Sequence, residues 1–155
     1  MRPPTGFGRG VLGLAERDAL ARTFHDAAIP VVWLRGAAWA EQLYDQPGER
    51  PFEDLDVWIR PADVAAAETV LTGLGYRPAR SGERVWVRAA GERPVDLHDG
   101  LWYLTADEAD AAWARAVSLS PLVKVLAPAD AAWELVAHAA IHHPEPKPQW
   151  IEDAA

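Results

Sequence analysis

The sequence contains no cysteine, and this absence excludes several kinds of chemistry. Without thiols there can be no disulfide framework, no thiolate zinc site and no cysteine nucleophile. The N-terminal stretch also lacks the continuous apolar run of a secretory signal, and no later stretch is apolar for long enough to span a bilayer. We therefore expect a soluble cytoplasmic protein.

Positive charge is scarce as well. The chain of 155 residues has 15 lysines and arginines against 23 aspartates and glutamates, which gives a net charge of -8 and a pI near 5.0. Because a nucleic-acid partner normally requires a basic face, this balance favours a small or neutral partner. Half of the residues are apolar, which suffices for the core of one domain.

Helix-like and strand-like patterns alternate along the chain, which favours an α/β or α+β fold with a mixed β-sheet flanked by helices. We predict strands at 29–34, 52–59, 85–87 and 95–97, and helices at 14–28, 35–44, 61–75, 105–117 and 129–143. The strands at 85–87 and 95–97 should form a hairpin beside the strand at 52–59. Thr105 and Glu108 form a capping-box signature at the start of one helix.

The predicted elements divide the chain into three parts. Residues 1–13 are expected to be a flexible segment, and residues 14–126 the core. Residues 127–155 then hold a C-terminal helix, a proline-rich spacer at 143–148, and the beginning of a further helix at 150–153.

Two aspartates interrupt the apolar run at 52–59. In a strand, Asp54 and Asp56 share one face while Leu55, Val57 and Ile59 fill the other. Two such charges repel by roughly 1 kcal/mol in water and about 4 kcal/mol near a protein surface unless a cation lies between them. If the strand at 95–97 lies beside this one, Asp96 joins the carboxylates and His98 follows on the same face. The alternative is a structural role for the aspartates, as turn caps or at an exposed strand end.

Four motifs in a fixed order strengthen the metal-site hypothesis. They are Leu34-Arg35-Gly36, then Arg50-Pro51-Phe52-Glu53-Asp54-Leu55-Asp56, then Leu74-Gly75-Tyr76, and finally Val95-Asp96-Leu97-His98. A last patch holds Asp130, His138 and Asp153. In this order and spacing the chain resembles the uncharacterised nucleotidyltransferase family within the DNA-polymerase-beta-like nucleotidyltransferase superfamily. The resemblance covers about residues 14 to 153.

The resemblance implies transfer of a nucleoside monophosphate from a nucleoside triphosphate to an acceptor hydroxyl, with release of pyrophosphate. We expect the triphosphate to be ATP and the acceptor to be a small molecule, a peptide or a protein. It implies that Asp54, Asp56 and Asp96 are the catalytic residues and bind Mg²⁺ or Mn²⁺, which prefer oxygen ligands. His98 is expected to support these ligands and not to bind the ion. The phosphate-binding residues would be Arg35, Gly36 and Arg50.

Alternatives remain open at this point. Gly36 has the simpler interpretation of a turn glycine, and the two arginines could pair with surface acids. Many superfamily members carry serine where this chain has Ala37, and relatives usually continue with more helices. The chain could therefore be a catalytically reduced nucleotide-binding or accessory module that needs a partner protein or a second copy of itself. His138 and His142, four residues apart on a helix, have a spacing that can bind zinc.

Overall fold

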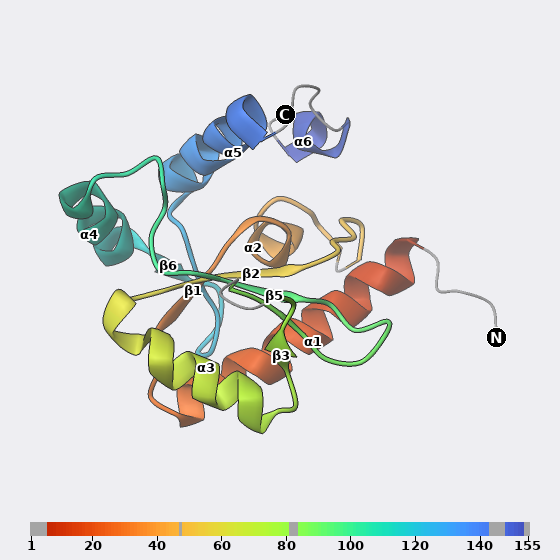
Figure 1. Cartoon of the computed structure of the whole chain (residues 1–155). Coiled ribbons are helices and arrows are strands. Elements are labelled where there is room, and N and C mark those ends of the chain that lie inside the picture. Colours follow the sequence, from red (N-terminus) through yellow and green to blue (C-terminus); the bar gives the residue numbers. More distant parts are fainter. Residues whose placement is uncertain (1–5, 47, 81–83, 143–147, 154–155) are drawn as a thin grey trace.

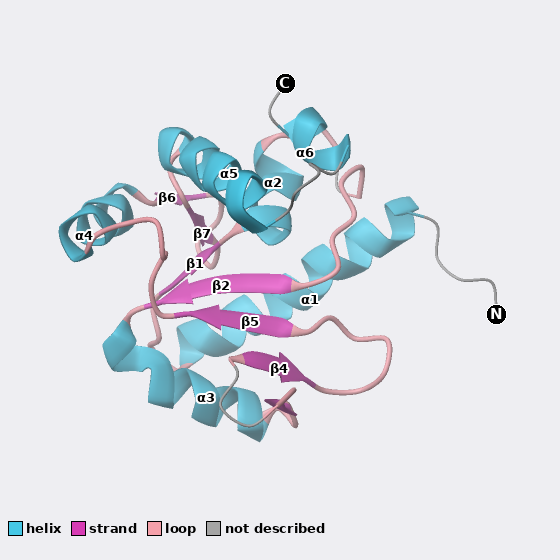
Figure 2. Cartoon of the chain, turned by 45° about the horizontal axis from the view of Figure 1, so that its top comes forward, coloured by secondary structure: helices cyan, strands magenta, loops and turns pink. Residues whose placement is uncertain are grey.

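The computed structural model describes residues 6–46, 48–80, 84–142 and 148–153. Its centre is a seven-stranded sheet with the spatial order β3-β4-β5-β2-β1-β7-β6 (Figure 2). β2 runs parallel to β5 and β1 parallel to β7, whereas the other neighbours are antiparallel. The strands are β1 (Val31–Trp33), β2 (Leu55–Ile59), β3 (Arg77–Pro78), β4 (Val85–Val87), β5 (Val95–His98), β6 (Val117–Ser118) and β7 (Lys124–Val125). The predicted mixed sheet flanked by helices is confirmed.

The helices lie on both sides of this sheet. In Figure 1, α1 and α3 lie below the sheet, while α5 and α6 lie above it and α4 lies towards one end. Their bounds are α1 (Gly6–Asp26), α2 (Arg35–Gln42), α3 (Val64–Gly73), α4 (Ala106–Arg115), α5 (Pro128–His142) and α6 (Pro148–Asp153), with a 3-10 turn at Pro61–Asp63. None of the described helices is long and apolar enough to cross a bilayer.

The alternation of side chains in β2 separates the core from the site. Leu55, Val57 and Ile59 belong to the larger buried cluster, which also contains Phe24 of α1 and Leu71 of α3. Side chains at alternate positions of a strand point to opposite faces, so Asp56 and Trp58 face the other side. A second cluster covers that side and consists of Val32, Leu34, Trp58, Leu101, Ala112, Leu126 and Ala131. Apolar residues therefore cover part of the face that carries Asp56.

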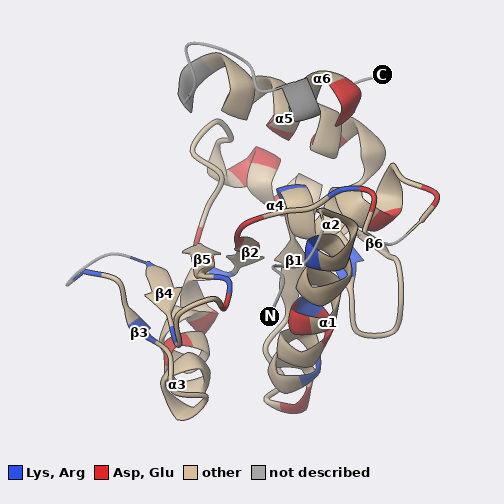
Figure 3. Ribbon diagram, turned by 90° about the vertical axis from the view of Figure 1, so that its right-hand side faces the viewer, with Lys and Arg blue, Asp and Glu red and all other residues tan. Residues whose placement is uncertain are grey.

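A buried arginine fixes α2 against α1. Arg17 of α1 is 1% exposed and donates through Nη1 to the carbonyl oxygen of Ala37, 2.8 Å away. Its Nη2 lies 2.6 Å from a carboxylate oxygen of Glu41. α1 carries charges of both signs (Figure 3), and these contacts use one of them to hold α2 at the edge of the site.

Most predicted elements are present, with differences at their ends. The hairpin of β4 and β5 lies beside β2, and the capping box of Thr105 and Glu108 is formed at α4. However, α1 begins at Gly6, so residues 6–13 are helical where a flexible segment was expected. The structure places a helix, α6, at the chain's last described residues, and residues 143–147 of the predicted spacer lie outside the described residues.

Candidate functional site

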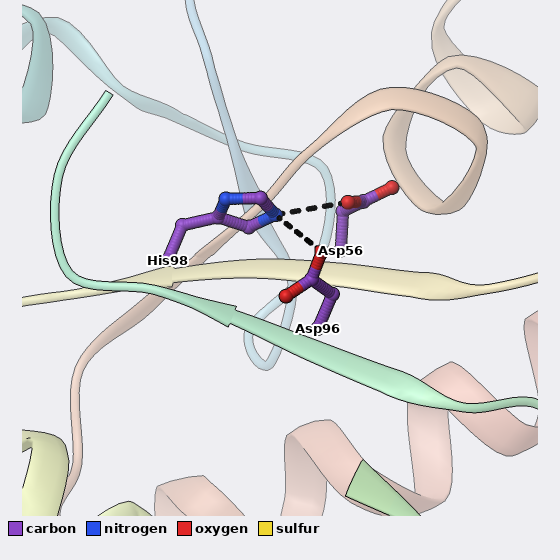
Figure 4. A group of neighbouring side chains, drawn as sticks. All are labelled: Asp56, Asp96 and His98. Atoms are coloured by element: carbon purple, nitrogen blue, oxygen red, sulfur yellow. Dashed lines mark hydrogen bonds and ion pairs between the residues drawn. The ribbon is translucent and has the colours of Figure 1, made fainter. Parts of the chain in front are cut away.

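The parallel pairing of β2 and β5 brings two of the three predicted carboxylates together. Asp56 lies opposite Asp96, and Trp58 lies opposite His98. Because alternate residues of a strand share a face, the side chains of Asp56, Asp96 and His98 rise from the same side of the sheet. Figure 4 shows the three side chains turned toward one another. Two of the three predicted metal-binding aspartates, Asp56 and Asp96, therefore lie together with His98.

The three side chains are close enough to share a cation. The Nε2 atom of His98 lies 2.9 Å from Oδ1 of Asp56 and 3.5 Å from Oδ2 of Asp96. One ligand atom from each residue lies within 4.8 Å of the other two. Asp56 is 3% exposed, whereas the side chain of Asp96 is 33% exposed. The cluster is therefore buried at Asp56 and open to solvent at Asp96.

Asp54 lies apart from this cluster. It occupies a bend just before β2 and is an exposed residue. It does not belong to the group of ligand atoms formed by Asp56, Asp96 and His98. Its carboxyl still interacts with the site. Partial burial is the larger cause that raises its pKa, and the negative charge of Asp56 is the next. The predicted metal role of Asp54 stays a prediction.

Opposing effects set the charges of Asp56 and His98. Burial by itself would raise the pKa of Asp56, but the hydrogen bond from His98 and the charge of Arg35 outweigh it and lower that pKa. For His98, burial by itself would lower the pKa, but the hydrogen bond and charge of Asp56, followed by the charge of Asp96, raise it. Each group therefore shifts the pKa of the other toward its charged form.

Arg35 contacts the cluster directly. Its Nη1 donates to Oδ1 of Asp56 at 2.6 Å, and its Nε donates to Oε1 of Glu134 at 2.9 Å. Arg35 begins α2 with a φ of 48°, a left-handed conformation that is uncommon for a residue other than glycine. The structure thus brings one of the predicted phosphate-binding residues to the cluster of Asp56, Asp96 and His98, where its guanidinium lies between the carboxylates of Asp56 and Glu134.

Glu134 is a residue that the sequence patterns did not single out. It lies on α5, is fully buried, and its pKa is raised to about 7 because burial outweighs the attraction of Arg35. A signal was present in the sequence, since Glu134 is an acid three residues after Ala131 and one before Leu135, on the apolar face of the predicted helix. A carboxylate in that position requires a partner, and Arg35 supplies it.

Gly36 and Arg50 are occupied by protein contacts. A Cβ atom added at Gly36 would lie 2.4 Å from Cβ of Phe52 and 2.8 Å from Nη1 of Arg50. Arg50 is 4% exposed and forms two hydrogen bonds with the carboxylate of Asp153, at 2.7 and 2.6 Å. These contacts show a packing role for both residues, and their predicted role in phosphate binding stays a prediction.

The donor set suits a hard divalent cation. Asp56 and Asp96 offer carboxylate oxygens, which Mg²⁺ and Mn²⁺ prefer, and a partly exposed carboxylate leaves room for water ligands. The imidazole of His98 lies within reach as a third ligand in its neutral form, and in this structure it holds Asp56 in place by a hydrogen bond. The residues therefore fit such an ion by their chemistry.

The fold is a mixed sheet with helices on both sides, and two carboxylates lie on adjacent parallel strands. A family model assigns a chain with this fold and site to the nucleotidyltransferase class. The chain belongs to the family described as "Uncharacterised nucleotidyltransferase", whose model matches residues 8–155. The resemblance noted from the sequence motifs is thereby confirmed. The protein is accordingly a transferase of nucleotidyl groups. Comparison with curated protein sequences found no significant match.

Three solved structures share the fold. The crystal structure of ANT(2'')-Ia in complex with adenylyl-2''-tobramycin has a TM-score of 0.68 and 16% identity, covering 92% of this chain and 86% of that one. The solution structure of the antibiotic-resistance factor ANT(2'')-Ia has a TM-score of 0.64 and 18% identity, with 91% and 82% covered. An antigenic nucleotidyltransferase-like protein from Paracoccidioides brasiliensis has a TM-score of 0.63 and 15% identity, with 92% and 73% covered.

Proposed function

We propose that this protein is a metal-dependent nucleotidyltransferase that moves a nucleoside monophosphate from a nucleoside triphosphate, ATP in the first instance, to an acceptor hydroxyl. The acceptor would be a small molecule, a peptide or a protein side chain. The observation that carries this proposal is the convergence of Asp56, Asp96 and His98 on adjacent parallel strands. Membership of a nucleotidyltransferase family supports it independently.

Asp56 and Asp96 would hold Mg²⁺ or Mn²⁺, with Asp54 contributing from the bend before β2. When bound, such a cation stabilises the charge on the oxygens of the transferring phosphoryl group. His98 keeps Asp56 oriented through the 2.9 Å hydrogen bond. Arg35, whose guanidinium already lies at Asp56, would contact the phosphate oxygens. Gly36 and Arg50 would contribute further phosphate contacts.

Asp96 is the carboxylate best placed to act as a general base, because its side chain is the more exposed of the pair. It would accept the proton of the acceptor hydroxyl while that oxygen bonds to the α-phosphorus. The bond from the α-phosphorus to the oxygen that bridges to the β-phosphorus breaks, and pyrophosphate leaves. The acceptor gains the nucleoside monophosphate.

A second candidate function is a nucleotide-binding or accessory module without turnover, which would act with a partner protein or as a homo-oligomer. Two observations favour it. Arg50 is tied to Asp153 by two hydrogen bonds, and Asp54 lies outside the cluster of ligand atoms. Such a module would bind a triphosphate but release no pyrophosphate.

Pyrophosphate release separates the two candidates. We expect the wild-type protein with Mn²⁺, ATP and a panel of hydroxyl acceptors to release pyrophosphate, and Asp96→Asn to lower this rate by about 10²–10⁴-fold, the contribution typical of a general base. Asp26→Asn, an exposed aspartate at the end of α1, is the matched control and should keep the wild-type rate. Equal rates for Asp96→Asn and wild type would refute the role of Asp96. ATP binding without pyrophosphate release from any acceptor would favour the accessory module.

A further inference from the structure

Glu134 poses a physical problem, because it is a fully buried acid on a helix that does not carry the metal ligands. Its Oε1 accepts a hydrogen bond from Nε of Arg35. Its Oε2 is buried without a hydrogen-bond partner among the residues that the structure describes. Burying a carboxylate is costly unless it is paired, so a specific role should explain why an acid occupies this position.

The partner of Glu134 is itself under constraint. Arg35 has a left-handed backbone, which a residue other than glycine keeps only where its surroundings hold it. Its guanidinium bridges two elements, with Nε toward Glu134 of α5 and Nη1 toward Asp56 of β2. A guanidinium is a planar fork of five donors, so one edge can stay bonded while another changes partner.

The oxygen that Arg35 contacts is one that a cation would need. Oδ1 of Asp56 accepts from Nη1 of Arg35 and also lies 2.9 Å from Nε2 of His98. Two nitrogen atoms, one from the Arg35 guanidinium and one from the His98 ring, therefore already contact this oxygen in the structure. For Asp56 to bind a cation through Oδ1, Arg35 has to withdraw Nη1, and that nitrogen then becomes available to a phosphate oxygen.

We propose that Glu134 is a positioning residue: it holds the Arg35 guanidinium by Nε while Nη1 exchanges between Asp56 and the phosphate oxygens of the nucleotide. This inference rests on the proposed function at Asp56 and Asp96. It adds a side chain of α5 that acts on the nucleotide only through Arg35. The C-terminal part of the chain thereby contributes to the site in the core.

Removal of the Glu134 carboxylate should change triphosphate binding in opposite directions, depending on whether Glu134 positions Arg35 or acts only by its charge. Glu134 is an acid close to the place where a polyanion would bind. If it acted only by its charge, its removal would relieve repulsion and tighten the binding of a triphosphate. If it positions Arg35, its removal leaves the guanidinium without its anchor, and triphosphate binding weakens.

Calorimetric titration with inorganic tripolyphosphate in the presence of Mn²⁺ measures whether triphosphate binding weakens or tightens. This ligand has no nucleobase, and no acceptor is needed. We expect Glu134→Gln and Arg35→Gln each to weaken binding by about tenfold, the scale of one charge-assisted hydrogen bond. The double variant should bind no more weakly than Arg35→Gln alone, because Glu134 acts through Arg35. Glu16→Gln, which removes the carboxylate paired with the buried Arg93 at 3.0 Å, is the control and should bind like wild type.

Glu134→Asp provides a second test that does not depend on the loss of charge. It keeps the carboxylate but withdraws it by one methylene group, so positioning predicts weaker binding for this variant too. Thermal unfolding of each variant establishes that it is folded, and if Glu134→Gln does not fold, Glu134→Asp decides. Wild-type or tighter binding by the folded Glu134 variants, or additive losses in the double variant, would overturn the inference.

A failure of the proposed function gives a different pattern. In that case the wild-type protein shows no Mn²⁺-dependent binding of tripolyphosphate, or Asp56→Asn binds it as well as wild type does. Both results remove the basis of the inference together with the proposed function. Binding that is lost in Asp56→Asn but kept in both Glu134 variants overturns the role of Glu134 alone.

Discussion

Asp56 is the residue at which the charges of the site converge. Its Oδ1 is contacted by Arg35 and by His98, and only 3% of the residue is exposed. Charge pairs of this kind are weakly screened by solvent, so they hold the carboxylate ionised in spite of burial. An ionised, fixed carboxylate binds a cation without having to lose a proton or reorient.

Period-two alternation made part of this residue-level arrangement predictable. It placed Asp56 on the face opposite Leu55 and Val57, and Asp96 and His98 followed once β5 lay beside β2. The same reasoning extended the strand to Asp54, which the structure places in a bend. The contact of Glu134 with Arg35 joins residues 99 positions apart, and no local pattern determines where α5 crosses the sheet.

Glu134 predicts a pH dependence of stability. Burial raises its pKa from 4.5 to about 7 in the folded protein, so between these values the folded state binds more protons than the unfolded state. The free energy of unfolding should therefore fall as the pH rises through this window, by at most about 1.4 kcal/mol per pH unit for one group. The contribution is fully present below pH 4.5 and lost above about pH 7.

Urea unfolding of wild type and Glu134→Gln between pH 5 and 8 measures this contribution. The variant should lose less stability than wild type as the pH rises, because it has no carboxyl group at this position. The raised pKa of His98 acts in the same direction in both proteins, so the difference between the two profiles reports Glu134 together with its interaction with His98. Parallel pH profiles for the two proteins would contradict the assignment to Glu134.

At the scale of secondary-structure elements, α2 packs tightly where it begins beside the site. Gly36 lies so near Phe52 and Arg50 that a methyl group has no room, with the nearest atom 2.4 Å from an added Cβ. The sequence showed glycine at the start of this helix and suggested a close approach of phosphate. In the structure the close approach comes from the Phe52 side chain, a long-range contact that the motif alone did not reveal.

We expect Gly36→Ala to lower the free energy of unfolding by about 1–3 kcal/mol, the usual cost of overpacking a core. Gly73→Ala at the end of α3 is the matched control, because an added Cβ there meets nothing within 4 Å. Its effect should be neutral, or stabilising by up to about 1 kcal/mol through the lower conformational entropy of the unfolded chain. Urea midpoints report both changes, and equal stability of Gly36→Ala and wild type would show that this packing relaxes freely.

The elements that were hardest to predict are the short edge strands. β3 (Arg77–Pro78) and β6 (Val117–Ser118) have two residues each and exist through pairing with β4 and β7. Two residues are too few for an alternating pattern. Longer elements with marked ends, such as the capped helix α4, were predicted to within a few residues.

At the scale of the whole molecule, one buried ion pair connects the C-terminal helix to the core. Asp153 of α6 receives two hydrogen bonds from Arg50 and one from the hydroxyl of Tyr44, at 2.8 Å. The Arg50 guanidinium also lies 5.2 Å from the centre of the Trp39 ring. This contact joins residues 103 positions apart and brings α6 close to the segment that leads into β2.

Removing one partner of the Arg50–Asp153 ion pair should lower the stability of the protein. Asp153→Asn leaves the buried Arg50 charge without its counter-charge, so we expect a loss of about 3–5 kcal/mol in the free energy of unfolding. Asp110→Asn, which removes the exposed partner of Arg60, is the control and should change stability by no more than about 1 kcal/mol. Similar urea midpoints for the two variants would mean that the contact of α6 contributes little to folding.

The binding of Mn²⁺ together with ATP, followed by calorimetry, tests the central claim most directly. Wild type should bind ATP in the presence of Mn²⁺ and much more weakly when the metal is chelated. Asp56→Asn should lose the metal-dependent part, because it removes the charge at the base of the cluster. Two results would contradict a metal-dependent nucleotidyl-transfer site at Asp56 and Asp96. One is that Asp56→Asn binds ATP as well as wild type does in the presence of Mn²⁺, and the other is that ATP binding by wild type does not respond to the metal.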